Sequence, residues 1–168
     1  MSLAVVIVLL VVLLRLAELV YAQRNAARLH AEGGIEHGAR HYPLFILLHG
    51  SWLVAIAVFA DPAALNLPLL GAFVVLQVAR LWVIASLGRH WTTRIITVPG
   101  APLVRQGPYQ FMRHPNYLIV AAEIALLPLV FGEWAVAAVF SAFNFALLRH
   151  RIRVENAALA ESTTFSSP

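Results

Sequence analysis

The stretch RQGPYQFMRHPNYL, residues 105–118, places arginine, histidine and tyrosine side chains immediately before an apolar segment. Pro115 has no amide hydrogen and a fixed φ, which suits the first turn of a helix, so a helix is predicted to begin at about His114 or Pro115. The free amides of that turn carry about half a positive charge and bind carboxylate or phosphate groups well. Because Arg113 and His114 add positive charge, we expect this segment to hold an anion.

A second polar segment, LLRHRIRVENAALA, follows the last apolar segment and contains good helix formers without a breaker. The helix is therefore predicted to continue to about Ala160. Arg151 and Glu155 are four residues apart and share one face of it, while Arg149 and Arg153 point roughly oppositely, toward lipid headgroups. Two interpretations stay open from these residues alone: a binding site built on that face, or an interfacial ring of arginines with one exposed ion pair.

The elements that must position these side chains are predicted to be membrane helices. The 168 residues are 61% hydrophobic and only 12% charged, whereas soluble domains carry about 25% charged residues. Segments long and apolar enough to cross about 30 Å of hydrocarbon are residues 2–22, 43–60, 66–87, 115–131 and 134–150. We therefore predict an all-α integral membrane protein with five transmembrane helices in one domain, residues 1–168, and a first helix that is retained rather than cleaved as a signal peptide.

The arginines predict the orientation of these helices. All twelve basic residues are arginine, and ten of them follow the first, third and fifth predicted spans, while the opposite loops contain none. Under the positive-inside rule these ten lie in the cytoplasm together with the C-terminus, and Asp61, Glu133 and the N-terminus lie outside. The bias toward arginine and alanine suggests a bacterial source, so we expect a multi-pass protein of the bacterial inner membrane. The arginines form no single solvated stripe, so nucleic acid is not an expected partner.

The segment between the third and fourth spans, GRHWTTRIITVPGAPLVRQGPY, is neither apolar enough to cross a membrane nor periodic enough for a helix. TRIITV has the composition of a strand and VPGAP that of a turn. A short hairpin or loop is therefore expected to fold over the cytoplasmic mouth of the bundle.

Polar side chains inside the predicted spans are costly in lipid and are expected either to pair or to serve function. They are Arg15, Glu18, His49, Gln77, Arg80, Glu123 and Asn144. Arg15 and Glu18 are three residues apart and are expected to pair. His49 and Gln77 are expected to bond between helices. For Arg80 and Glu123, an ion pair between helices and a place in a pocket wall both stay open.

Taken together, the two polar segments resemble the isoprenylcysteine carboxyl methyltransferase family. Its members are small polytopic membrane enzymes whose C-terminal half carries an RHPxY element, a helical hairpin and an RxxxEE-like element. The matching segments are RHPNY at 113–117 and RIRVEN at 151–156. The resemblance covers about residues 88–160, the expected catalytic half. Asn156 replaces the second glutamate, which leaves the role of that position open.

The resemblance implies an S-adenosylmethionine site at the cytoplasmic face, enclosed by the last two spans and the loop before them. The cofactor-binding residues that it implies are Tyr109, Arg113, His114, Pro115, Asn116, Tyr117, Glu155 and Asn156. In this interpretation His114 and the amides after it take the cofactor carboxylate, and Glu155 accepts from its amine or ribose. Arg151 is implied to lie at the reacting end, where it orients an anionic acceptor.

Methyl transfer is a displacement at an already activated methyl group, so the protein mainly aligns and desolvates the reactants, and no metal is expected. A carboxylate acceptor is ionised at neutral pH, whereas a phenol needs a base or a nearby arginine. The candidate bases are His90, Glu123 and His150. We expect a lipophilic acceptor that arrives from the surrounding membrane lipids. Residues 88–109 resemble the bacterial branch that O-methylates long-chain alkylpyrones or alkylresorcinols.

Two other classes of protein stay open. RHPNY also resembles the corresponding element of membrane sterol and steroid 5α-reductases, which bind NADPH, but there a glycine and an acidic residue closely follow the tyrosine. Here LIVAAE follows Tyr117, which counts against reduction. The second alternative is a non-catalytic membrane scaffold, which only Asn156 favours. No GxGxxG element follows a strand, so a soluble Rossmann methyltransferase is excluded.

Overall fold

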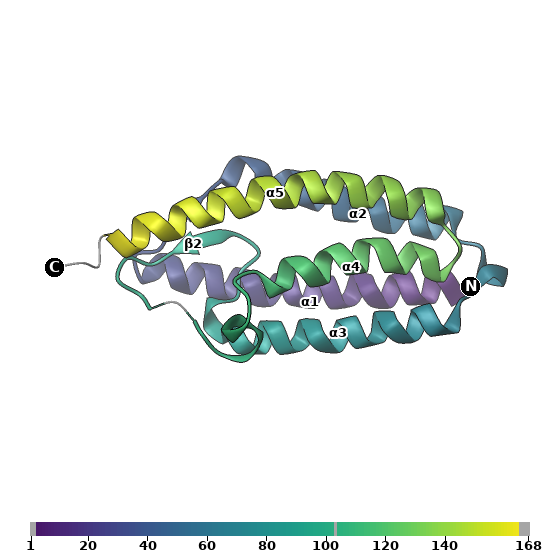
Figure 1. The fold of residues 1–168 in the computed structure, drawn as a ribbon, viewed down its shortest axis with the longest axis horizontal. Coiled ribbons are helices and arrows are strands. Elements are labelled where there is room, and N and C mark those ends of the chain that lie inside the picture. The colour runs from purple at the N-terminus through teal and green to yellow at the C-terminus, as the bar shows by residue number, and fades with distance from the viewer. Residues whose placement is uncertain (1–2, 103, 165–168) are drawn as a thin grey trace.

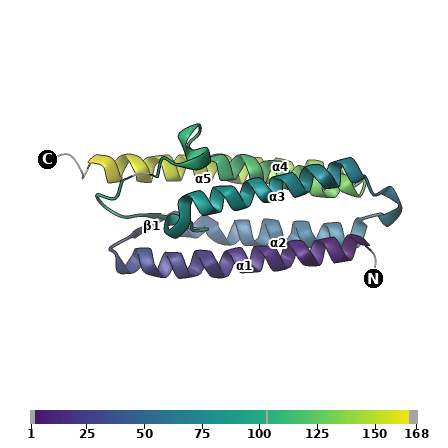
Figure 2. The same ribbon diagram turned by 90° about the horizontal axis from the view of Figure 1, so that it is seen from below.

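Five α-helices make up most of the part of the chain that the computed structural model describes, residues 3–102 and 104–164 (Figure 1). They are α1 (Leu3–Ala31), α2 (Tyr42–Phe59), α3 (Leu67–Leu87), α4 (Pro115–Val130) and α5 (Trp134–Thr164). Figure 2 shows two layers, with α1 and α2 in one and α3, α4 and α5 in the other. Helix α4 lies in the middle of its layer, because it packs against both α3 and α5.

The outer surface of this bundle is apolar, as expected of a helical membrane protein. Helices α1, α2 and α3 are long and apolar enough to cross a membrane, and α4 is a shorter apolar helix. Large apolar side chains on the outside are more than 60% exposed, for example Leu13, Leu47, Val58, Val75 and Phe143. Water would disfavour such a surface, whereas lipid does not.

The helix boundaries agree with the predicted spans except at two ends. Helix α1 continues beyond residue 22 to Ala31, because the segment QRNAARLHA contains no helix breaker before Gly33 and Gly34. The predicted end of the first span at residue 22 therefore falls about two and a half helical turns short of the end of α1. Helix α5 extends past the last apolar residues as expected and ends at Thr164.

A two-stranded antiparallel sheet joins the two polar connections at one end of the bundle. Strand β1 (Ile35–His37) pairs with β2 (Ile95–Thr97), with Ile35 opposite Thr97. The strand predicted in TRIITV is present, but its partner follows α1 instead of lying in the same loop. Glu36 accepts a hydrogen bond from Arg94 at 2.6 Å, and the side chains of His37 and Thr97 are 2.9 Å apart. The connection after α1 is therefore fixed to the loop before α4.

Short 3₁₀ turns connect the other elements. They span Ala39–His41, Pro62–Ala64, Gly88–His90 and Gly107–Gln110. Gly107 has φ +56° and packs so closely on α3 that an added Cβ would lie 2.1 Å from the hydroxyl of Ser86. Gln106 also donates to the backbone carbonyl of Ser86 at 2.7 Å, which holds the loop before α4 against α3.

A closed ring of charged side chains joins α1, α3 and α4 inside the bundle. Arg15 contacts Glu18 at 2.8 Å and Glu123 at 2.9 Å. Arg80 contacts the same two carboxylates, at 2.8 Å and 3.1 Å. Gln77 donates to Glu123 and accepts from Arg15. Two positive and two negative charges thus compensate one another, which is what burial in an apolar bundle requires.

The remaining polar residues of the predicted spans behave differently from one another. His49 bonds the carbonyl of Phe45 in its own helix at 2.8 Å, so the expected bond between helices is absent in the described structure. Asn144 is 1% exposed, and its side-chain oxygen has no partner among the described residues.

Replacing Glu123 by glutamine should strongly destabilise the protein. The change leaves the buried Arg80 and the partly buried Arg15 facing one carboxylate, so we expect the free energy of unfolding to fall by about 3–5 kcal/mol. Denaturant unfolding in detergent micelles would measure this loss. Glu32→Gln serves as the control, because Glu32 pairs with Arg89 at 3.7 Å on the surface and should change stability by less than about 1 kcal/mol. Equal effects of the two substitutions would show that the ring contributes no more than a surface pair.

Candidate functional site

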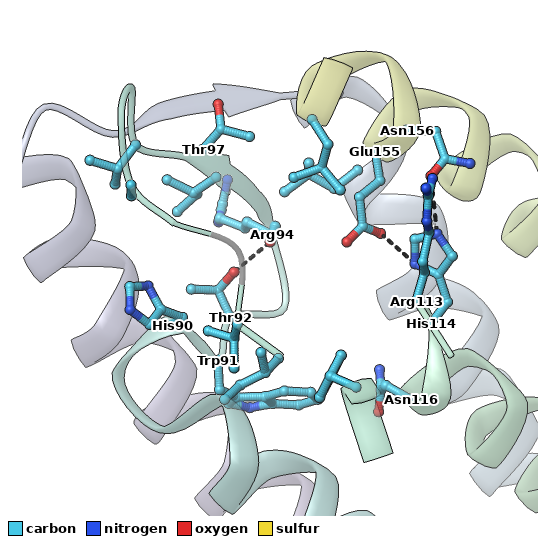
Figure 3. A pocket seen from close by; sticks show the side chains of 18 of the residues that line it. His90, Trp91, Thr92, Arg94, Thr97, Arg113, His114, Asn116, Glu155 and Asn156 are labelled. Carbon is cyan, nitrogen blue, oxygen red and sulfur yellow. Dashed lines mark hydrogen bonds and ion pairs between the residues drawn. The ribbon is translucent and has the colours of Figure 1, made fainter. Parts of the chain in front are cut away.

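A cavity of about 550 Å³ opens at the end of the bundle where the arginines gather. Its walls come from Leu29 near the end of α1, the end of α3, strand β2, the loop before α4, the first turn of α4 and the second half of α5 (Figure 3). The predicted site residues that line it are His90, Tyr109, Arg113, His114, Asn116, Tyr117, Arg151, Glu155 and Asn156. The structure thus brings together side chains from two segments that are remote in the sequence.

The first turn of α4 forms one wall of the cavity. The helix begins at Pro115, as its fixed φ and missing amide hydrogen predict. Arg113 and His114 precede it, and both line the cavity. Pro115 does not line the cavity but sets the direction in which the helix leaves the loop. The amides that follow therefore lie beside the cavity with two basic side chains.

The hydroxyl group of Tyr117 connects the α4 wall to α5. It donates a hydrogen bond to the carboxylate of Glu155 and accepts one from Nε of Arg151 at 2.8 Å. Arg151 also donates from Nη2 to the backbone carbonyl of Thr93, again at 2.8 Å. Arg151 and Glu155 share a face of α5, as their spacing predicts, and the tyrosine hydroxyl bridges them.

His114 provides the second connection between the two helices. Its Nε2 donates to the side-chain oxygen of Asn156 at 3.1 Å, and its Nδ1 lies 3.6 Å from Glu155 (Figure 3). The imidazole also stacks on the ring of Tyr117, with centroids 5.2 Å apart. Asn156 therefore keeps the hydrogen-bond acceptor that a second glutamate would offer here, although it lacks the charge.

Positively charged side chains outnumber negatively charged ones around the cavity. Arg94, Arg105, Arg113 and Arg151 line it, and Glu155 is the only acidic residue among the described residues of its walls. Such a cavity favours a ligand with an anionic group and leaves one carboxylate for a cationic or hydrogen-bond-donating group. Tyr109 adds a neutral donor, because burial and then the negative charge of Glu155 raise the pKa of its phenol.

Not every residue predicted for the site is found there. Glu123 belongs to the buried ring of charges, and both of its oxygens accept hydrogen bonds within that ring. His150 lies outside the cavity walls and packs its ring against that of His41, with centroids 5.0 Å apart. Of the candidate bases, only His90 lines the cavity.

Sequence reasoning missed several residues of the cavity wall. Trp91, Thr92, Arg94 and Thr97 all line it (Figure 3). Trp91 is only 3% exposed. The sequence signal that could have identified Trp91 is its position at the end of a predicted span, directly before a strand-like segment. The direction of the Trp91 side chain depends on contacts with α1, which the spacing of residues in the sequence does not reveal.

The fold and the site define a helical membrane protein with a positively charged cavity between the ends of its last two helices. A model of the isoprenylcysteine carboxyl methyltransferase family matches residues 69–161. The chain belongs to this family of membrane methyltransferases, whose members use S-adenosylmethionine as methyl donor. The match confirms the resemblance of residues 88–160 and extends it to include most of α3.

Two bacterial proteins are similar along most of their length. The uncharacterized protein YpbQ of Bacillus subtilis (strain 168) is 38% identical over 152 residues, which covers 88% of this chain and 90% of that protein. An uncharacterized protein of Haemophilus influenzae is 27% identical over 143 residues, covering 82% of this chain and 83% of that protein. No solved structure matches the chain.

Tyr109 should ionise at a higher pH than an exposed tyrosine. Burial and the charge of Glu155 raise the pKa of this phenol above its usual value of about 10. During alkaline titration, the phenolate absorbance that develops near pH 10 should therefore be the same in the wild type and in Tyr109→Phe. The difference between the two proteins should develop only at higher pH. The same comparison in denaturant is the control, because an unfolded phenol titrates near its usual pKa of about 10. Because unfolding lowers the pKa of Tyr109 again, this residue should reduce stability as pH rises above about 10.

Proposed function

We propose that this protein is an S-adenosylmethionine-dependent methyltransferase that O-methylates a lipophilic acceptor. The observation that carries the proposal is the double connection between the RHPNY and RIRVEN segments at one cavity. His114 bonds Asn156, and Tyr117 bonds Glu155. A shared cavity gives the two segments a common ligand, whereas separate surfaces would have favoured a scaffold.

The residues around the cavity fit the chemical groups of the methyl donor. His114, Arg113 and the first amides of α4 are suited to its carboxylate, and Glu155 is suited to its amine or ribose hydroxyls. Asn116 has a buried side-chain oxygen without a partner among the described residues, which leaves an acceptor for a ligand. When bound, the cofactor supplies a methyl group already activated on a sulfonium. The protein therefore needs to align the acceptor and exclude water.

Arg151 is the residue proposed to orient the acceptor. A guanidinium has five N–H donors, and the contacts to Tyr117 and Thr93 engage only Nε and Nη2. The remaining donors can hold an anionic oxygen of the acceptor. The contact with Tyr117 keeps the guanidinium in one orientation, as a positioned electrostatic group requires.

The acceptor class is proposed from the expected position of the cavity at the membrane surface. An isoprenylcysteine-like carboxylate arrives ionised and needs no base, while an alkylpyrone- or alkylresorcinol-type hydroxyl needs its pKa lowered or a base. We propose that Arg151 lowers the pKa of such a hydroxyl and that His90 acts as the base. The likeness of residues 88–109 to the bacterial polyketide-lipid branch favours the hydroxyl acceptor. An apolar tail would reach the cavity from the surrounding lipids.

The proposed orientation places this cavity at the cytoplasmic face of the bacterial inner membrane. All five helices are proposed to cross the membrane, with α4 the shortest, the N-terminus outside and the C-terminus inside. Ten arginines in the segments at the cavity end support this orientation through the positive-inside rule. It gives the cavity access to cytoplasmic cofactor.

Removing either side chain that is proposed to hold the cofactor should weaken binding. We expect His114→Ala and Glu155→Ala each to raise the Kd for S-adenosylmethionine by roughly tenfold or more, because each loses a charge-assisted contact. Calorimetry on the purified protein in detergent would measure this. Glu32→Ala is the control, because Glu32 pairs with Arg89 on the surface outside the cavity. Unchanged affinity in both cavity variants would argue against a cofactor site between α4 and α5.

Arg151→Ala should reduce turnover more than cofactor affinity. Incubating the protein with methyl-labelled cofactor and a lipid extract of the host should yield a labelled lipid, and the variant should produce it at least about tenfold more slowly. Arg151→Lys keeps the charge but loses the planar fork, so it should recover only part of the rate. If wild-type protein oxidises NADPH and labels no lipid, the reductase class is favoured instead.

A further inference from the structure

We propose that residues 107–113, the turn that precedes α4, insert the side chains of Phe111 and Met112 into the headgroup region of the bilayer. The turn thereby anchors one wall of the cavity to the membrane surface. Neither Phe111 nor Met112 lines the cavity. Their contact with lipid therefore goes beyond the proposed function and does not depend on which reaction the cavity performs.

Phe111 is the most exposed large apolar residue in the described part of the chain. It is 81% exposed, and Met112 beside it is 44% exposed. Two neighbouring apolar side chains that lie open on a turn are unfavourable in water. They are favourable at a membrane surface, where apolar side chains reach the boundary between headgroups and acyl chains.

The backbone of the turn holds these two side chains outward. The amides of Phe111 and Met112 both donate to the carbonyl of Pro108, at 3.1 Å and 3.2 Å. Gly107 begins the turn with φ +56°, a conformation that favours glycine. In Figure 2 the turn projects from the layer of α3, α4 and α5, on the side away from α1 and α2. The exposure of the pair therefore belongs to a defined turn.

Packing against α3 sets the depth of the turn. Helix α3 is long and apolar enough to cross a membrane. A Cβ added to Gly107 would lie 3.4 Å from the indole nitrogen of Trp82, which is 56% exposed on the outside of α3. Trp82 precedes the last residue of that helix, Leu87, by five residues, or about 7.5 Å. The turn thus lies back along the span, at a level where tryptophan commonly marks the membrane interface.

Arginines flank the apolar pair. Arg105 and Arg113 are both exposed, and neither has an acidic partner among the described residues. Positive side chains beside an apolar pair suit anionic headgroups that lie above acyl chains. A second copy of this turn would bring the same positive charges and repel them. The composition of the turn therefore favours a lipid surface over self-association.

The anchor has a consequence for the cavity. Tyr109 lies two residues before Phe111, and His114 lies two residues after Met112; both Tyr109 and His114 line the cavity. The depth to which the pair inserts therefore sets the position of that wall relative to the bilayer. In this way the turn couples the shape of the cavity to the membrane surface.

Site-specific labelling tests the insertion, because the chain contains no cysteine. Gln110→Cys places a fluorophore on the turn at an exposed position outside the cavity and keeps the apolar pair. The labelled protein is placed in nanodiscs of phosphatidylethanolamine and phosphatidylglycerol that hold one copy each. We expect the label to lose most of its emission to lipids spin-labelled near the headgroup and little to iodide in the water.

Two further positions calibrate the label. Val75→Cys reports the embedded case, because Val75 is 66% exposed on the outside of α3. Its label should be quenched most by lipids spin-labelled deep in the acyl chain. Ala157→Cys reports the aqueous case, because Ala157 is exposed on α5 one turn beyond Arg153. Its label should be quenched by iodide.

Removing the apolar pair should release the turn. In the double variant Phe111→Ser, Met112→Ser, the label at Gln110→Cys should lose its quenching by lipid and become accessible to iodide. The double variant Phe111→Leu, Met112→Leu keeps two apolar side chains and should behave as the wild type. Because the pair is exposed, both double variants should unfold at a temperature close to that of the wild type. Thermal unfolding thus separates a released turn from a folding defect.

Two results would overturn the anchor. A label at Gln110→Cys that iodide quenches and the lipid quencher does not would place the turn in water. A label shielded from both quenchers in single-copy nanodiscs would show that the protein itself covers the turn. No methyl donor or acceptor enters these measurements, so their failure leaves the proposed function intact, and a failed methylation assay leaves the anchor intact.

Discussion

Polar side chains inside an apolar bundle must find partners within the protein, because lipid offers none. The ring formed by Arg15, Glu18, Arg80 and Glu123 meets this constraint with two charges of each sign. It also fixes α1, α3 and α4 relative to one another. Since α4 lies in the middle of its layer, fixing it sets where its first turn meets α5. The cavity therefore depends on pairing that occurs deeper in the bundle.

The sequence predicted the helices well because their signal is local. Apolar segments and proline positions determine where α2, α3, α4 and α5 begin, and the arginine pattern groups their polar connections at one end. The end of α1 was missed because a polar helix outside the apolar segment has no hydropathy signal. The strand at Ile95–Thr97 was predicted, but its partner was not, since pairing between remote segments depends on the arrangement of the helices.

The candidate site was predictable where two short elements of the sequence carry its residues. RHPNY and RIRVEN supplied most of the polar groups on one side of the cavity, and the role left open for Asn156 is that of a hydrogen-bond acceptor for His114. The other side was not predictable. Glu123 has the chemistry of a base, yet its oxygens are engaged by Arg15, Gln77 and Arg80. Residue type suggests a role, while the partners of the side chain decide whether it is available.

The two halves of the chain therefore contribute differently to one cavity. The C-terminal half supplies charged groups that suit a ligand, and α1 supplies Asn25, Arg15 and Glu18, which contact the protein rather than the cavity. Asn25 holds the backbone of Trp91 directly, and Arg15 and Glu18 act through Arg80 and Glu123. A site whose walls come from four helices keeps its shape only if those helices cannot slide. Because a shift of α1 along the bundle would break both Asn25 hydrogen bonds and the ion pairs of the ring, the first helix constrains the shape of the cavity.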